Sequence, residues 1–149
     1  MAYDPPDYGG YARQSADVQS QYNSQSSANA YGRFVGQQRG NRSLGDTYRN
    51  YKRQTPKFQS GLAQRGVAGP GVGGGVMNQA MSRYVGDFAR QYGRQQQDFT
   101  AEMQQYDINQ ANLNDWRERS LAGIKADQAR AIARDAEQLD LLQQIYGGL

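Results

Sequence analysis

The second half of the chain, from Val76 to Leu149, carries apolar residues at a helical spacing. Along the main apolar stripe, neighbouring positions are separated by 3, 4, 7 or 8 residues, and the segment contains no proline. Alanine, glutamine, arginine, aspartate and glutamate fill most of the other positions, a composition typical of helices. The pattern predicts long amphipathic helices over 76–149.

Part of this pattern repeats every 11 residues. Eleven residues make three turns at about 3.67 residues per turn, so the stripe stays nearly straight along a helix. A straight apolar stripe predicts packing against other helices in an oligomer. The repeat runs through Met77, Phe88, Phe99, Gln110, Leu121 and Ile132, and the predicted helix-packing interface consists of Phe88, Phe99, Met103, Leu113, Trp116, Leu121, Ile124, Ile132 and Leu139.

The segment 107–115 decides whether 76–149 forms one helix or two. It is rich in aspartate and asparagine, which favour caps and turns. Asp115 is followed three residues later by Glu118, which resembles an acidic variant of a capping box at a helix start. The sequence therefore favours a break that makes a helical hairpin, with one long helix as the alternative. Gly147 and Gly148 are the expected C-cap.

Residues 1–30, the first half of a predicted arm over 1–60, show neither a helical nor a strand period of apolar positions. Single aromatic residues are instead spaced through polar sequence. Because a Tyr ring can be buried while its hydroxyl stays in water, this pattern predicts an extended, largely irregular arm that lies over a neighbour. A disordered tail is the alternative. The expected anchors are Tyr31, Phe34, Tyr48, Tyr51 and Phe58, and a Gly-rich hinge is expected over 61–75.

The amino-acid composition reduces the number of function classes that fit this chain. Leu, Ile, Val and Phe together number 22 of 149 residues, below the roughly 20% needed for a self-sufficient core. One copy is therefore expected to be completed by partners. The chain has no Cys and no His, which excludes thiolate and imidazole chemistry. Asp98 and Glu102 lie one turn apart, and a solvated helix face is the expected role for them. No catalytic, cofactor-binding or metal site is predicted, and neither an export signal nor a membrane span is expected.

Positive charge gathers in one part of the chain. Residues 1–75 carry nine Lys or Arg against four acids, whereas residues 76–149 carry eight against ten. This asymmetry indicates an anionic partner, either nucleic acid or an acidic protein surface. Arginines interleaved with aromatics also suit non-specific nucleic-acid binding. The candidate anion contacts are Arg39, Arg42, Arg49, Lys52 and Arg53, with a merely solvated arm as the alternative.

The order of these segments resembles small virion structural proteins of tailed bacteriophages. The likeness is greatest from Arg65 to Arg134, where Gly-Pro-Gly-Val-Gly-Gly-Gly opens into Met-Asn-Gln-Ala-Met-Ser-Arg-Tyr and a long amphipathic segment. The resemblance implies a non-enzymatic virion component, made in the host cytoplasm, that assembles with itself and other virion proteins at the portal and tail or inside the head. A nucleic-acid-associated packaging protein and a scaffold that leaves before maturation are the alternatives. Neither a membrane nor a small-molecule substrate is expected.

Overall fold

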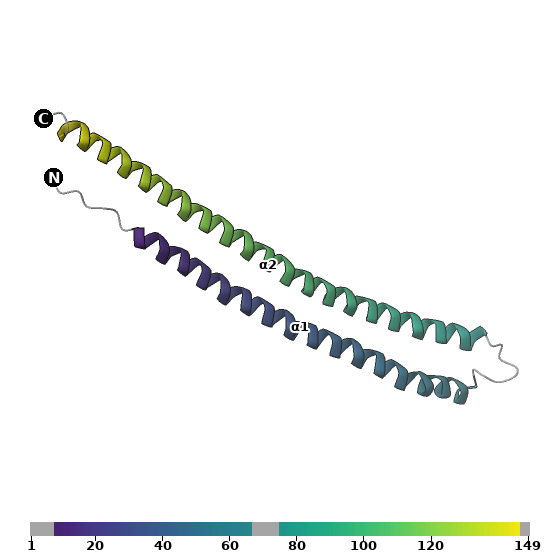
Figure 1. Cartoon of the computed structure of the whole chain (residues 1–149). Coiled ribbons are helices and arrows are strands. Elements are labelled where there is room, and N and C mark those ends of the chain that lie inside the picture. Colours follow the sequence, from purple (N-terminus) through teal and green to yellow (C-terminus); the bar gives the residue numbers. More distant parts are fainter. Residues whose placement is uncertain (1–7, 67–74, 147–149) are drawn as a thin grey trace. The chain divides into compact units, whose positions relative to one another are not determined.

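The computed structural model describes residues 8–66 and 75–146, which form two long helices that pack against each other (Figure 1). Helix α1 spans Tyr8–Gln64 (57 residues), and helix α2 spans Gly75–Tyr146 (72 residues). No strand occurs in the described ranges. The prediction of a mostly α-helical chain is thus confirmed.

The expected extended arm is replaced by helix α1 from Tyr8 onward. The side of α1 that packs on α2 repeats every 11 residues, through the half-buried positions Val18, Asn29, Gly40, Tyr51 and Leu62. Asn29 and Gly40 are not apolar, so a count of apolar residues misses this period. The part of the arm over residues 1–7 lies outside the described residues.

Helix α2 continues unbroken through 107–115, so the favoured break there is wrong and the single-helix alternative holds. The polar side chains of this segment do not cap a helix. Gln110 and Asn114 instead form hydrogen bonds with side chains of α1, which removes their competition with the helical backbone. The expected C-cap at Gly147 and Gly148 lies outside the described residues.

A glycine two residues beyond the end of α1 at Gln64 adopts the left-handed conformation. Gly66 has a φ of 73°, and its N–H donates to the carbonyl of Ala63 at 3.1 Å. A glycine adopts this conformation without a Cβ clash, which makes it the usual residue after a helix end. The expected hinge therefore begins later than residue 61, since 61–64 are helical. Its residues 67–74 lie outside the described part.

The chain divides into two compact units, each built from both helices. Unit 1 comprises Met1–Ala30 and Asp107–Leu149, and unit 2 comprises Tyr31–Tyr106. The helices are antiparallel in each unit. In unit 2, Gly40 lies against Phe99 and Tyr51 against Phe88. In unit 1, Tyr8 contacts Asp135, Tyr22 contacts Asn114 and Asn29 contacts Gln110.

The described residues of neither unit enclose a hydrophobic core. Among the described residues the only buried one is Gly36, and no hydrophobic or polar side chain is fully buried. Two helices can cover only one side of each other, so the residues along their contact remain half-exposed. Each unit therefore gains little from the burial that normally stabilises a domain.

Candidate interaction surface

Unit 2 is held by a stack of aromatic rings between the helices. Tyr51 of α1 stacks on Phe88 of α2 with ring centroids 3.9 Å apart and an interplanar angle of 16°. Phe58 stacks on Tyr84 at 4.5 Å, and Tyr51 also lies 5.6 Å from Tyr84. Each such pair contributes about 0.5–1.5 kcal/mol beyond the area that it buries. The stack therefore fixes this part of α1 against α2.

A row of glycines follows on the same side of α1. Gly32, Gly36 and Gly40 are spaced by four residues and leave room for large side chains of α2. A Cβ added at Gly32 would lie 2.9 Å from a Tyr106 ring carbon, and one at Gly36 would lie 3.1 Å from Met103 Cε. At Gly40 it would lie 2.9 Å from Phe99 Cγ, with two further ring carbons closer still. The glycines thus act as sockets for Phe99, Met103 and Tyr106.

Unit 1 has a polar layer where unit 2 has rings. The amide of Gln110 lies between the helices and donates through Nε2 to Ser26 Oγ (3.0 Å) and Tyr22 Oη (3.3 Å). Its Oε1 accepts from Asn29 Nδ2 at 3.2 Å. Tyr22 Oη in turn donates to Asn114 Oδ1 at 2.7 Å. A half-buried polar network pairs well in only one register, so it specifies how the helices align.

Arg117 completes this layer. Its guanidinium carbon lies 4.5 Å from the centroid of the Tyr22 ring, a cation–π contact. The side chain is half-buried, and its Nε is buried without a hydrogen-bond partner. Sequence reasoning selected the neighbouring Trp116, which is also half-buried, and missed Tyr22, Gln110 and Arg117. The position of Gln110 in an otherwise apolar 11-residue repeat was the available signal.

The residues selected from the apolar stripe of α2 divide into two groups. Ile132 and Leu139 are 50% and 46% exposed. They lie near the end of α2, close to the level where the described part of α1 begins at Tyr8. The half-buried group consists of Phe88, Phe99, Met103, Leu113, Trp116, Leu121 and Ile124.

The five expected anchors of the arm also divide. Tyr51 and Phe58 pack on α2 in the aromatic stack. Tyr48 is 45% exposed, with its ring centroid 6.5 Å from that of Phe88 and the Lys52 ammonium 4.9 Å from its own centroid. Tyr31 and Phe34 are 71% and 55% exposed. These last two rings are available to another molecule.

The candidate anion contacts are all exposed on α1, and they do not share one face. Arg42 is two residues from Gly40, and Arg53 is two residues from both Tyr51 and Thr55. Two residues correspond to about 200° around a helix, so Arg42 and Arg53 project away from α2. Arg49 projects similarly and forms an ion pair with Asp46 at 2.5 Å. Arg39 and Lys52 lie toward the flanks, Arg39 beside Phe99 and Glu102 at a surface hollow.

The carboxylate pair Asp98 and Glu102 lies on the surface of α2. Asp98 and Glu102 line the same hollow as Arg39, and both are exposed to solvent. No group of three or more potential metal-binding side chains occurs in the described part. Within the same residues, neither helix contains a stretch apolar enough to cross a membrane.

Comparison with known proteins gives no relative. No family model matches the sequence, and neither the curated proteins nor the solved structures contain a match.

Proposed function

We propose that this chain is a non-enzymatic structural protein of a bacteriophage virion, present in several copies and assembled through its helices. The observation that carries the proposal is the absence of any buried hydrophobic side chain among residues 8–66 and 75–145. Ordering a chain costs roughly 1.5 kcal/mol per residue. Two half-exposed helices offset only part of this cost, and repeated contacts with other copies or larger proteins supply the rest.

The exposed apolar residues support assembly in the same way. Tyr31 and Phe34 on α1, and Ile108, Leu141 and Ile145 on α2, are all more than half exposed. Large apolar side chains at the surface of a chain without a core are candidates for contact with neighbours. The phage assignment itself comes from the resemblance of segment order and composition, and the portal, the tail and the head interior are the proposed locations.

Mass spectrometry of purified phage particles tests this function directly. Several copies per particle are expected in the virions of a phage whose genome encodes this chain. Its absence from mature particles, combined with its presence in assembly intermediates, would favour a scaffold or assembly chaperone instead. Absence from both would refute a virion role.

Sedimentation velocity of the isolated chain tests whether one copy needs contacts with other copies to be stable. Concentration-dependent association is expected at micromolar concentrations, with a melting temperature that rises with concentration. A compact monomer that melts cooperatively at the same temperature over a hundredfold concentration range would contradict the argument from burial.

A nucleic-acid-associated packaging protein is the second candidate. The observation that favours it is the exposure of Arg39, Arg42, Arg49, Lys52 and Arg53 on α1. Such contacts release counterions, so binding would weaken steeply between 50 and 200 mM salt. If the isolated chain binds single-stranded DNA with this salt dependence, the second candidate is supported. If it binds no single-stranded DNA at 50 mM salt, the second candidate is excluded.

A further inference from the structure

The two units carry opposite net charges. Unit 2 contains eleven Lys or Arg and four Asp or Glu, a net charge of +7, whereas unit 1 contains six and ten, a net charge of −4. The split at the glycine-rich segment understates this contrast, because it separates α1 from the part of α2 that it packs on. Each copy therefore presents a basic unit and an acidic unit.

The outward face of α1 in unit 2 combines arginine with exposed aromatic rings. Phe34 lies two residues from both Gly32 and Gly36, which face Tyr106 of α2, so its ring projects about 200° away from that contact. Tyr31, Arg42 and Arg53 follow one another at 11-residue intervals and thus lie along one line of the helix. Within the described residues, neither Arg42 nor Arg53 forms an ion pair. We call these four residues the outer row.

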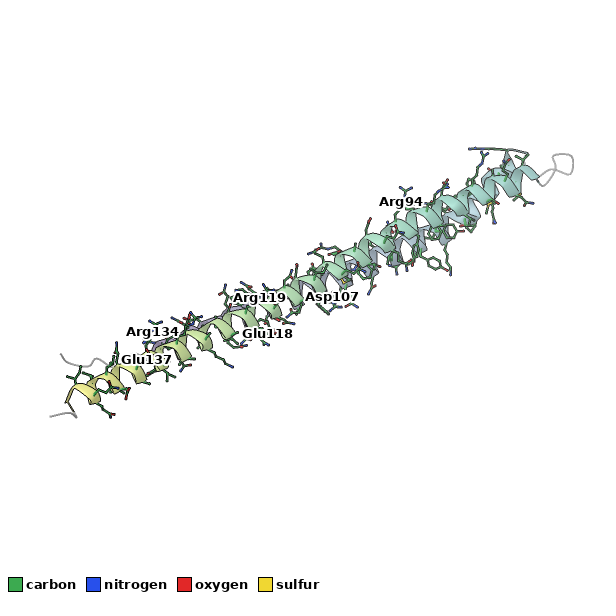
Figure 2. The ribbon with its side chains drawn as sticks, turned by 90° about the horizontal axis from the view of Figure 1, so that it is seen from above. Arg94, Asp107, Glu118, Arg119, Arg134 and Glu137 are labelled. Carbon is green, nitrogen blue, oxygen red and sulfur yellow. The ribbon has the colours of Figure 1, made fainter. Side chains whose placement is uncertain are left out.

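An acidic row with the same spacing lies on α2 in unit 1. Asp107 and Glu118 are also 11 residues apart, and Figure 2 shows both on one side of α2, with Arg119 on the other. Eleven residues of helix span about 16 Å. Two carboxylates and two guanidinium groups at equal intervals can form two ion pairs at once between parallel or antiparallel helices.

We propose that the outer row of one copy docks on the acidic row of a second copy, so that Arg42 and Arg53 meet Asp107 and Glu118. This inference rests on the proposed multi-copy assembly and specifies the surfaces that meet. Arginine suits the contact because its planar guanidinium binds a carboxylate through two hydrogen bonds. Tyr31, on the same line of α1, and Phe34 beside it bring apolar area to the contact that one copy leaves exposed. Every copy carries both rows, so the contact can recur from copy to copy.

Charge reversal tests the pairing in the full-length chain. The double variants Arg42→Glu/Arg53→Glu and Asp107→Lys/Glu118→Lys each replace two attractive pairs by two repulsive ones. Each is expected to weaken self-association by about tenfold at 50 mM salt, less at 500 mM. The quadruple variant restores opposite charges and is expected to regain most of the association. Sedimentation velocity measures all four proteins, and circular dichroism establishes that each remains helical.

Two further variants sharpen the test. Arg83→Glu/Arg94→Glu makes the same change in net charge within unit 2, at the same 11-residue spacing, but lies on α2 and not on the outer row, and a change of less than about threefold is expected. Glu118→Lys alone serves if the Asp107 substitution lowers the helix content, and it is expected to weaken association by about threefold.

The outcomes separate the two proposals. If the native chain associates and neither charge-reversed variant changes that association, the pairing of the rows is wrong while multi-copy assembly stands. If the native chain remains monomeric, both fail. If Arg42→Glu/Arg53→Glu loses retention of single-stranded DNA and associates as the native chain does, the outer row binds nucleic acid and the proposed contact is overturned.

Discussion

Replacing Gly40 by alanine tests whether the Phe99 ring packs directly against Gly40 of α1. The added Cβ would lie 2.5 Å from Phe99 Cε2 and 2.9 Å from Phe99 Cγ. Favourable carbon–carbon contact begins at about 3.5 Å, so the ring has to move by about 1 Å. Phe99 Cγ is the atom that joins the ring to its own Cβ. It moves only if the side chain changes rotamer or the helices separate.

Two opposing terms set the magnitude. Alanine is favoured over glycine inside a helix by about 0.5–1 kcal/mol, whereas overpacking a close contact costs about 1–3 kcal/mol. Gly40→Ala is therefore expected to lower the free energy of unfolding by about 1 kcal/mol, or to lower Tm by about 2–4 °C. Gly93 lies in the same unit with no atom within 4 Å of the added Cβ. Gly93→Ala is expected to gain the full helix term and raise Tm.

Thermal melting followed by circular dichroism measures these variants, at one fixed protein concentration because association shifts Tm. Phe99→Ala removes the ring, so Gly40→Ala should become stabilising in that background by about 0.5–1 kcal/mol. The double-mutant cycle should then give a coupling of about 1.5 kcal/mol. Equal stabilisation by Gly40→Ala and Gly93→Ala in the native background would show that Phe99 does not occupy this socket.

Three other substitutions test separate features. Tyr22→Phe removes a hydroxyl that donates to Asn114 and accepts from Gln110. It should lower the free energy of unfolding, measured by urea denaturation, by about 0.5–1.5 kcal/mol. The control Tyr31→Phe, at a ring that is 71% exposed, should leave the free energy of unfolding unchanged. Gln110→Leu should leave helix content unchanged and give more than one set of amide NMR signals, because the polar layer that specifies register is lost; a single set would contradict that role. Pro56 lies inside α1 and lacks the N–H that would donate to the Lys52 carbonyl. Pro56→Ala should therefore stabilise the chain by about 1–3 kcal/mol and slow the hydrogen exchange of nearby backbone amides. Amide exchange as fast as in the native chain would show that the helix is already continuous there.

The helical nature of α2 could be predicted from sequence because its packed positions are mostly apolar. Phe88, Phe99 and Leu121 keep the 11-residue period visible. The helix α1 could not be found in this way, because its packed side uses Gly36, Gly40 and other small or polar residues. Their role depends on the size of the side chain opposite, which a pattern of apolar positions does not contain.

The continuous helix over 107–115 also could not be predicted from local sequence, in this case because of polar residues. Asparagine and aspartate favour caps when their side chains have no better partner than the local backbone. Here Gln110 and Asn114 have partners in Ser26, Asn29 and Tyr22, so the helix continues. Propensity alone was insufficient because the competing hydrogen bonds come from residues about 80–90 positions away in sequence.

An 11-residue repeat on both helices creates a problem of alignment, since a slip by 11 residues returns the same helix faces to each other. The contacts that differ from one repeat to the next oppose such a slip. A slip would place Phe99 opposite Tyr51 or Asn29 instead of Gly40, and Gln110 opposite Gly40 or Val18 instead of Asn29. In one direction Phe99 would take the place that Phe88 has on Tyr51, and in the other it would face the polar Asn29. In both directions the amide of Gln110 would lose its hydrogen-bond partners Ser26, Asn29 and Tyr22. The native alignment thus depends mainly on the hydrogen bonds of Gln110, because ring contacts that recur along the repeat stabilise more than one register.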